Sequence, residues 1–410
     1  MTQAISLGAR RFGAMRVVGP VCAAHFLSHY YIIILAPLFS FIRADYGVSY
    51  TDLALALTAF NMVSAVLQTP AGFLVDRIGA RVVLIAGVAL GAIAFAVAGL
   101  VHSFIVFIAM FAVAGIGNTA YHPADYSLLS DHTAPARIGQ IFSFHTFAGI
   151  LGGAVAPATL LVMQGQFGWR GAFVGAALLG FPVLLLLIVQ RPPPADRAAE
   201  QRRARAEVTG ADGPQNADHG WRLLLSAPIV LNLCFFILLS LMGGLSSFLV
   251  VALGALYGTP NTLANVALTG LLLMNALGVL IGGLLATRTS GHATVAGLCL
   301  AAAGAGTALI GLVGFSSYLL VLLAALSGLF IGIASPSRDM LVRAVTPSGA
   351  YGRVFGFVSS GYNIGAMIAP TVYGILMDHN QPRAVFLFSA ACSILCIGTV
   401  VLAFSSRERS

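Results

Sequence analysis

Long apolar runs alternate with short polar breaks along most of the chain. The runs occupy about residues 17–41, 52–75, 82–101, 105–130, 139–163, 168–190, 228–253, 262–286, 293–313, 317–343, 352–377 and 383–404. Each is close to the roughly 20 residues that a helix needs to cross a bilayer, and runs of this length span lipid as helices. The pattern therefore predicts an all-α membrane protein with twelve transmembrane helices.

One long polar stretch follows the sixth run. It reads RPPPADRAAEQRRARAEVTGADGPQNADHGW over residues 191–221 and has no apolar period. Its proline, arginine and acidic residues are typical of a flexible linker. We therefore expect a six-helix bundle over 1–190, a cytoplasmic linker over 191–221 and a second six-helix bundle over 222–410.

An internal repeat relates the two halves. Shifting the chain by 213 residues superimposes identical residues without a gap over about 43 positions. The coincidences include Gly115 with Gly328, Pro123 with Pro336, Gly139 with Gly352 and Gly152 with Gly365. Self-similarity at a fixed offset indicates duplicated structural units. In a membrane chain it favours two pseudo-symmetric bundles with a substrate path between them.

Composition and charge place the chain in a membrane. It is 59% hydrophobic and 8% charged, with a mean hydropathy of +0.94, whereas soluble domains have about 25% charged residues. The net charge of +8 comes from arginine, since the chain has no lysine. With the N-terminus inside, the arginines of the loops fall on the cytoplasmic side, except Arg43, Arg170 and Arg383. We therefore expect a multi-pass protein of a bacterial cytoplasmic (inner) membrane, with both termini cytoplasmic.

The first apolar run and the cysteines suggest no further processing or ligation. The run has a basic start, reaches full spanning length and shows no small-residue cleavage site, so we expect a retained helix rather than a signal peptide. The five cysteines lie in or beside apolar runs without metal-ligand spacing, which is typical of core residues. No nucleophile elbow, zinc motif, paired catalytic carboxylates or phosphate-binding Gly-Lys-Ser/Thr loop occurs. We therefore expect no enzyme, cofactor or metal, and no transport driven by ATP on this chain.

A small charged turn separates the second and third runs. It reads GFLVDRIGAR and contains Gly72, Asp76, Arg77, Gly79 and Arg81. The glycines permit a tight turn, the aspartate can accept from amides at a helix N-terminus, and the arginines can pair with carboxylates. We therefore expect a gate that latches the two bundles on the cytoplasmic side.

This turn, together with the twelve-span layout, resembles the major facilitator superfamily. The resemblance implies two helical bundles that work by alternating access and a loop that stabilises the outward-facing state. We expect the protein to function as a monomer. The second-half copy of the turn, GGLLATRTSGH at 282–292, keeps Gly283 and Arg288 but has no aspartate.

Three further stretches resemble the branch that includes the fosmidomycin-resistance efflux proteins. They are HFLSHYYIIILAPLFSFIRADYGVSY, GNTAYHPADYSLLS and FSFHTFAGILGG. Two departures argue against the common drug/proton antiporters. Apolar residues around Phe111 replace the arginine expected in the fourth span, and the Gly-Pro pattern of the fifth survives only as GILGGAVAP.

Five ionisable residues within the spans are candidates for proton coupling. His25 and His29 are four residues apart and His122 and Asp125 three apart, so each pair shares a helix face, and His145 lies in the next span. Such groups are costly in lipid, and histidine titrates near neutral pH. The alternative for each histidine is a core residue that is hydrogen-bonded to a neighbouring helix.

Asp125 and Arg338 occupy matching positions of the repeat, and Asp339 follows Arg338. A guanidinium pairs with carboxylate, phosphate or phosphonate groups, so Arg338 is a candidate to bind an anionic substrate. The alternative is a gate, because Asp125, Arg338 and Asp339 lie near the predicted cytoplasmic helix ends. The other candidate substrate contacts are His29, Tyr30, Asn61, Tyr121, Tyr362 and Asn363.

Together these features favour a secondary active transporter. Its expected partners are a small polar or anionic organic molecule, protons and the lipid bilayer, and we expect no nucleic acid. Proton-coupled efflux is the leading prediction, because the resemblance to efflux proteins implies it. The alternatives are proton-coupled uptake of a small organic acid and a transporter-like receptor that binds a ligand without moving it.

Overall fold

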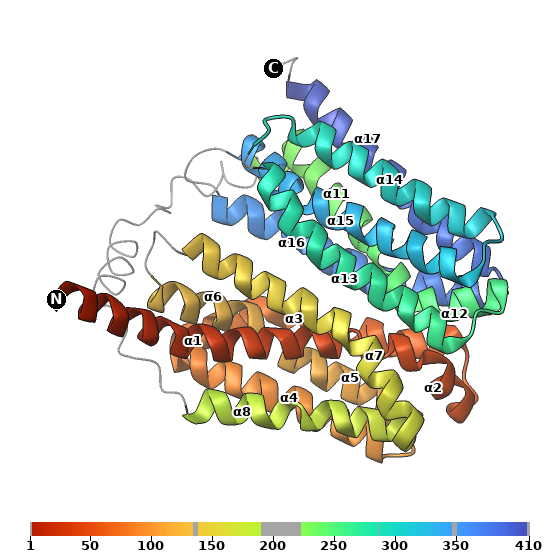
Figure 1. The fold of residues 1–410 in the computed structure, drawn as a ribbon, viewed down its shortest axis with the longest axis horizontal. Coiled ribbons are helices and arrows are strands. Elements are labelled where there is room, and N and C mark those ends of the chain that lie inside the picture. The colour runs from red at the N-terminus through yellow and green to blue at the C-terminus, as the bar shows by residue number, and fades with distance from the viewer. Residues whose placement is uncertain (1, 134–137, 190–222, 287, 347–350, 408–410) are drawn as a thin grey trace. The chain divides into compact units, whose positions relative to one another are not determined.

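The residues that the structure describes form helices joined by short turns and loops (Figure 1). The structure is a computed structural model that describes residues 2–133, 138–189, 223–286, 288–346 and 351–407. The predicted linker, 191–221, lies outside the described residues.

The first half of the chain forms the spans predicted for it. Its helices are α1 (Thr2–Ile32), η1 (Ala36–Leu38, a 3₁₀ turn), α2 (Phe39–Tyr46), α3 (Tyr50–Ile78), α4 (Ala80–Leu100), α5 (Phe104–Asn118), α6 (Tyr121–His132), α7 (Ile138–Leu178) and α8 (Gly180–Val189). The fourth span is broken between α5 and α6, just before Pro123. Thr119 and Ala120 between them keep helical backbone angles, and a proline in the first helical turn needs no amide partner, so the span continues through the break as Phe104–Leu129.

The second half repeats this sequence of helices. It consists of α11 (Ala227–Gly243), α12 (Leu245–Tyr257), α13 (Asn261–Ala286), α14 (His292–Leu312), α15 (Ser317–Val345), α16 (Tyr351–Asp378) and α17 (Pro382–Arg407). The seventh span is divided into α11 and α12 at Gly244.

Helix length and hydropathy support the twelve predicted spans. Ten stretches of the described chain are long and apolar enough to cross a membrane. One of them, Phe144–Val189, covers most of two predicted spans, which are separated by a kink at Gly168, where a φ of 69° interrupts the helix and favours glycine. The 28-residue α16 occupies the eleventh predicted run. The prediction of an all-helical protein with twelve spans is therefore confirmed.

Contacts divide the chain into two compact units. Unit 1 comprises Met1–Ile34, Met62–Gly153 and Met163–Ala211, and unit 2 comprises Leu35–Asn61, Ala154–Val162 and Asp212–Ser410. Unit 2 therefore includes the start of α3 and a segment of α7, in addition to the second half of the chain. The division into 1–190, 191–221 and 222–410 stays a prediction.

The same helix pairs recur within each unit. In unit 1, α4 packs against α5 and α8, and α1 packs against α8. In unit 2, α14 packs against α15 and α17, and α11 packs against α17. Repeat-related glycines make equivalent close contacts: a Cβ on Gly152 would overlap the carbonyl oxygen of Phe26, and one on Gly365 would lie 2.6 Å from that of Ile237. The packing therefore follows the 213-residue repeat.

Phe111 belongs to an aromatic core in unit 1. Its ring is 1% exposed, and its centroid lies 5.0 Å from Phe107, 5.4 Å from Phe95 and 6.2 Å from Phe173. These rings come from α4, α5 and α7. The position where the resemblance implies an arginine is therefore occupied by a buried ring that packs in the core of unit 1.

Candidate functional site

A buried aspartate joins three helices of unit 1. Asp125 on α6 is fully buried, and its Oδ2 lies 2.9 Å from Nε2 of His145 on α7 and 3.3 Å from Nδ1 of His25 on α1. The two imidazole rings stack with centroids 3.7 Å apart. One carboxylate oxygen therefore faces two histidines from different helices.

His29 and His122 complete this group, which we call the histidine cluster (His25, His29, His122, Asp125 and His145). The ring of His29 is 4.7 Å from that of His25, and the ring of His122 is 5.3 Å from it. The spacings of four residues on α1 and three on α6 bring each pair to one face. All five residues predicted for proton coupling therefore lie together in the structure.

Gly149 on α7 makes room for these rings. A Cβ at this position would lie 2.7 Å from Nε2 of His25 and 2.9 Å from Cδ2 of His29. Only glycine lets α7 approach α1 this closely without moving the imidazoles. The cluster therefore depends on a residue with no side chain of its own.

Several buried polar atoms in and beside the cluster make no hydrogen bond within the described residues. They are Oδ1 of Asp125, Nδ1 of His145, the hydroxyl of Tyr121 and Nδ1 of His25, whose approach to Asp125 is close enough for an ion pair but lacks hydrogen-bond geometry. Buried polar groups are normally paired, so the cluster has capacity to bind a further proton or small polar species. His25, Asp125 and His145 can also each offer one ligand atom such that the three atoms lie within 4.8 Å of one another, close enough to hold a metal ion.

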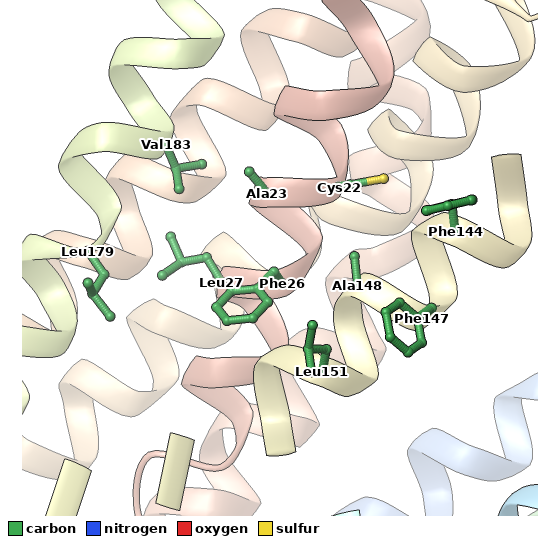
Figure 2. Close-up of a pocket in the computed structure, with 10 residues that line it drawn as sticks. All are labelled: Cys22, Ala23, Phe26, Leu27, Phe144, Phe147, Ala148, Leu151, Leu179 and Val183. Carbon is green, nitrogen blue, oxygen red and sulfur yellow. The ribbon is translucent and has the colours of Figure 1, made fainter. Parts of the chain in front are cut away.

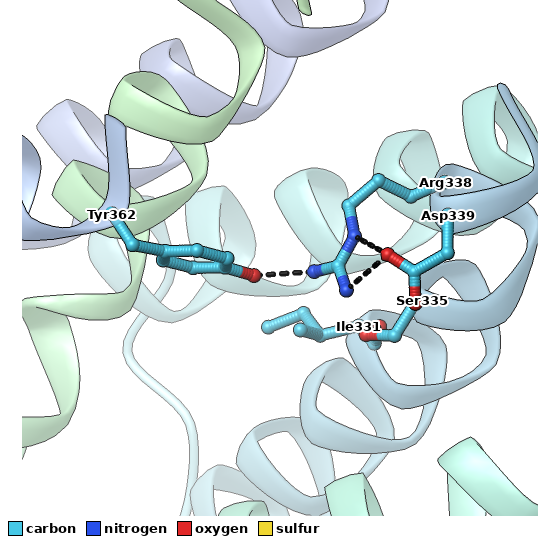
Figure 3. Close-up of polar contacts among 5 residues, drawn as sticks. All are labelled: Ile331, Ser335, Arg338, Asp339 and Tyr362. Carbon is cyan, nitrogen blue, oxygen red and sulfur yellow. Dashed lines mark hydrogen bonds and ion pairs between the residues drawn. The ribbon is translucent and has the colours of Figure 1, made fainter. Parts of the chain in front are cut away.

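Arg338 forms a second polar site, in unit 2. From α15 its Nε and Nη2 atoms donate to Oδ1 of Asp339 at 3.0 and 2.8 Å, and Nη1 donates to the hydroxyl of Tyr362 on α16 (Figure 3). The guanidinium carbon lies 4.9 Å from the ring centre of Phe236 on α11 and 5.6 Å from that of Tyr362. Two aromatic rings and one carboxylate therefore hold the cation.

The ion pair of Arg338 and Asp339 is only partly buried. The Arg338 side chain is 13% exposed, whereas that of Asp339 is 51% exposed. Asp339 is therefore the more exposed partner of the pair, and Arg338 the more buried one.

The remaining predicted substrate residues occupy different settings. Tyr30 and Tyr121 are buried, at 1% and 3% exposure, and Asn363 is partly exposed. Asn61 donates to the carbonyl oxygens of Leu57 and Ala366, so its amide links α3 to α16. The described contacts bring Tyr362 to Arg338 but do not bring these four residues there, and their substrate role stays a prediction.

The charged turn at 72–81 joins α3 to α4. Gly79 precedes α4 with a φ of 92°, which favours glycine. Arg81 donates to the carbonyl oxygens of Leu187 and Ile188 at 2.9 and 2.8 Å, so it caps the C-terminal end of α8 within unit 1. Gly72 has open space around it, Arg77 is exposed, and the side chain of Asp76 lies outside what the structure describes. The gating role of this turn stays a prediction.

Asp378 makes a polar contact that the sequence did not reveal. From the end of α16 it accepts the backbone amides of Tyr50 and Thr51, at 2.7 and 2.8 Å, within unit 2. Nearby, Thr58 donates to the carbonyl oxygen of Met367. An acid beside a helix N-terminus is a recognisable pair, but the two partners are more than 300 residues apart in the chain. We refer to the contact of Asp378 with Tyr50 and Thr51 as the α3 cap.

An apolar pocket lies between α1, α7 and α8 in unit 1 (Figure 2). It has a volume of about 450 Å³, and its lining includes Cys22, Phe26, Phe144, Phe147 and Leu151. No charged side chain of the described residues lines it. The pocket therefore offers nothing to hold an anion, unlike the Arg338 site.

A family of known proteins is similar in sequence to most of this chain. The model of the Major Facilitator Superfamily matches residues 21–260 and 236–410. The probable sulfoacetate transporter SauU of Cupriavidus necator is 26% identical over 416 residues, which cover 95% of this chain and 93% of that protein. The probable L-galactonate transporter of Escherichia coli K12 is 32% identical over 139 residues, which are 34% of this chain and only 31% of that protein.

Solved structures share the fold. A point mutant of the nucleoside transporter NupG has a TM-score of 0.76 and 14% identity, with 95% of this chain and 100% of that chain covered. A bacterial homologue of the human lysosomal transporter Spinster, inward-facing and occupied, has a TM-score of 0.69 and 16% identity, with 95% and 96% covered. The fosmidomycin-resistance branch stays a prediction, but the family is shown: this chain belongs to the major facilitator superfamily.

Proposed function

We propose that the protein is a secondary transporter that couples the movement of a small organic anion to the movement of protons. The histidine cluster is the observation that carries the proposal. It places Asp125 between the imidazoles of His25 and His145, at 3.3 and 2.9 Å, in a fully buried position. An imidazole in water gains or loses its proton near neutral pH, and a carboxylate within hydrogen-bonding distance stabilises the added charge.

Proton binding at this cluster has a large electrostatic effect. A proton adds one charge to a group that is removed from water, where charges interact strongly and are costly. The protonated and unprotonated clusters therefore favour different surroundings, and a conformational change that alters access to the cluster shifts its proton occupancy. This linkage is what a proton-driven transporter requires.

Arg338 supports an anionic substrate. Its guanidinium offers N–H pairs that match the oxygens of a carboxylate or sulfonate, and it is held by Tyr362, Phe236 and Asp339. The two relatives described above are named for L-galactonate and sulfoacetate, both of which are organic acids. Proton-coupled efflux and proton-coupled uptake use the same two sites and differ in whether anion and proton move in opposite directions or together.

Flux in proteoliposomes tests the proposal. Purified protein is reconstituted with an internal pH dye, and the movement of labelled sulfoacetate or L-galactonate is followed under an imposed pH gradient. We expect the wild-type protein to accumulate an acid against its gradient and to move protons with it or against it. The Asp125→Asn variant should retain exchange of the acid across the membrane but lose its response to the pH gradient.

The controls separate this proposal from the alternatives. His102→Gln replaces an exposed histidine outside the cluster, and we expect it to behave like the wild type. Gradient-driven accumulation that persists in Asp125→Asn contradicts the coupling role of the cluster. Binding of an acid without any exchange in the wild type favours the receptor alternative. The sign of the proton flux decides between efflux and uptake.

A further inference from the structure

We propose that Asp339 is an internal counter-ion, which occupies the anion subsite on Arg338 when no substrate is bound and is displaced by the acid group of the substrate. The inference rests on the proposed function, because it assumes that Arg338 receives the anion. It adds a residue that competes with the substrate and thereby sets its affinity and its chemical class.

The geometry of the pair is that of a replaceable ligand. Nε and Nη2 of Arg338 both donate to the same oxygen, Oδ1 of Asp339 (Figure 3). These two N–H groups lie parallel on one edge of the guanidinium, and an acid that places one oxygen on each of them forms the stronger bidentate pair. Asp339 uses one oxygen for both donors, so the edge is occupied but not optimally paired.

The backbone explains this arrangement. Arg338 and Asp339 are consecutive residues of α15, and neighbours in a helix do not face each other. The aspartate therefore bends back to reach the guanidinium and cannot present both oxygens squarely to that edge. A free acid has no such constraint.

The exposed fractions of the two side chains favour entry of the substrate's acid group on the side of Arg338 that Asp339 occupies. Asp339 is 51% exposed and Arg338 is 13% exposed, while Phe236 and Tyr362 lie against other parts of the guanidinium. A buried cation without an anion is strongly unfavourable, so Asp339 balances the charge until a substrate replaces it. The two anions compete for one edge.

Tyr362 narrows the class of substrate. Its hydroxyl oxygen accepts from Nη1 of Arg338, which leaves the phenolic proton available to donate to an oxygen of the arriving acid. Ser335 is directed elsewhere, because its hydroxyl donates to the carbonyl oxygen of Ile331. The site therefore fits small organic acids that present one carboxylate or sulfonate group to Arg338 and Tyr362.

Binding measurements on the full-length protein test the inference. Sulfoacetate and L-galactonate are titrated into purified wild-type protein and into Asp339→Asn, Asp339→Glu and Arg338→Gln variants by calorimetry, with thermal melting as a check of folding. Removing the competitor in Asp339→Asn should tighten binding of an acid by about two- to fivefold, the strength of an ion pair that is partly exposed. Asp339→Glu has the longer reach needed to pair with both N–H groups and should weaken binding.

Each outcome distinguishes the inference from the proposed function. Asp131→Asn, a change of an acid on α6 outside this site, should leave the affinity unchanged. If Asp339→Asn binds no more tightly than the wild type while Arg338→Gln loses binding, the counter-ion inference is wrong and the anion site stands. If Arg338→Gln binds as well as the wild type, or if the wild type binds neither acid, the proposed anion site fails and the inference fails with it.

Discussion

The α3 cap predicts a measurable shift in conformation when Asp378 is changed. The carboxylate accepts two backbone amides at the start of α3, from Tyr50 and Thr51, at 2.7 and 2.8 Å. Asp378→Ala removes both acceptors and the negative charge beside the helix N-terminus. Asp378→Asn keeps one acceptor oxygen and removes the charge, so its effect should be intermediate.

The size of the effect follows from these interactions. Loss of a side chain that caps a helix costs about 0.5–2 kcal/mol, and loss of a charge beside the helix dipole costs about 0.3–1 kcal/mol. Together they give about 1–3 kcal/mol, which corresponds to a change of about 5- to 150-fold in a conformational equilibrium. We expect the population in which the start of α3 separates from α16 to rise by this factor.

Thiol labelling measures this population. Ala54 on α3 is fully buried, and a Cβ on Gly374 of α16 would lie 3.2 Å from its Cβ, so Ala54→Cys reports on this interface. In a background without the five native cysteines, the rate of labelling by a membrane-impermeant maleimide should rise about 5- to 150-fold in Asp378→Ala. His379→Gln, which alters the exposed neighbouring residue, is the matched control. A labelling rate that stays at the wild-type level in folded Asp378→Ala refutes the reasoning.

Two further predictions concern unit 1. Gly149→Ala places a Cβ 2.7 Å from Nε2 of His25, so we expect it to abolish the response to a pH gradient while the binding of an acid at Arg338 is retained. The control Gly153→Ala, whose added Cβ would have its nearest atom 3.6 Å away, should have no effect. Retained coupling in Gly149→Ala contradicts the role of the histidine cluster. Phe111→Ala leaves a cavity in the aromatic core and should lower the free energy of unfolding by about 3–5 kcal/mol, measured by denaturant titration in detergent; a loss below about 1 kcal/mol, far under the cost of emptying a packed aromatic site, shows that Phe111 is not part of the core.

The sequence predicts the helices well because their signals are local. Run length and hydropathy locate the spans, and the spacing of His25 from His29, or of His122 from Asp125, places each pair on one face. The 213-residue repeat further predicts which helices correspond.

Contacts between helices are harder to predict. The meeting of α16 with the start of α3 at Asp378, and the space that Gly149 leaves for His25, depend on how helices pack, and no local pattern encodes it. The pairing of Arg338 with Asp339 is equally hidden in the sequence, because neighbours in a helix do not ordinarily face each other.

Two corresponding positions of the repeat carry different side chains in the two halves of the chain. Asp125 and Gly149 in the first half correspond, at an offset of 213, to Arg338 and Tyr362 in the second. In the first half the carboxyl group of Asp125 lies among imidazoles, beside a glycine. In the second half the guanidinium of Arg338 contacts the phenol of Tyr362. If the two proposed sites are correct, each half of the repeat holds one of them, and we expect changes around Tyr362 to alter which acid is carried and changes around Gly149 to alter how its movement is driven.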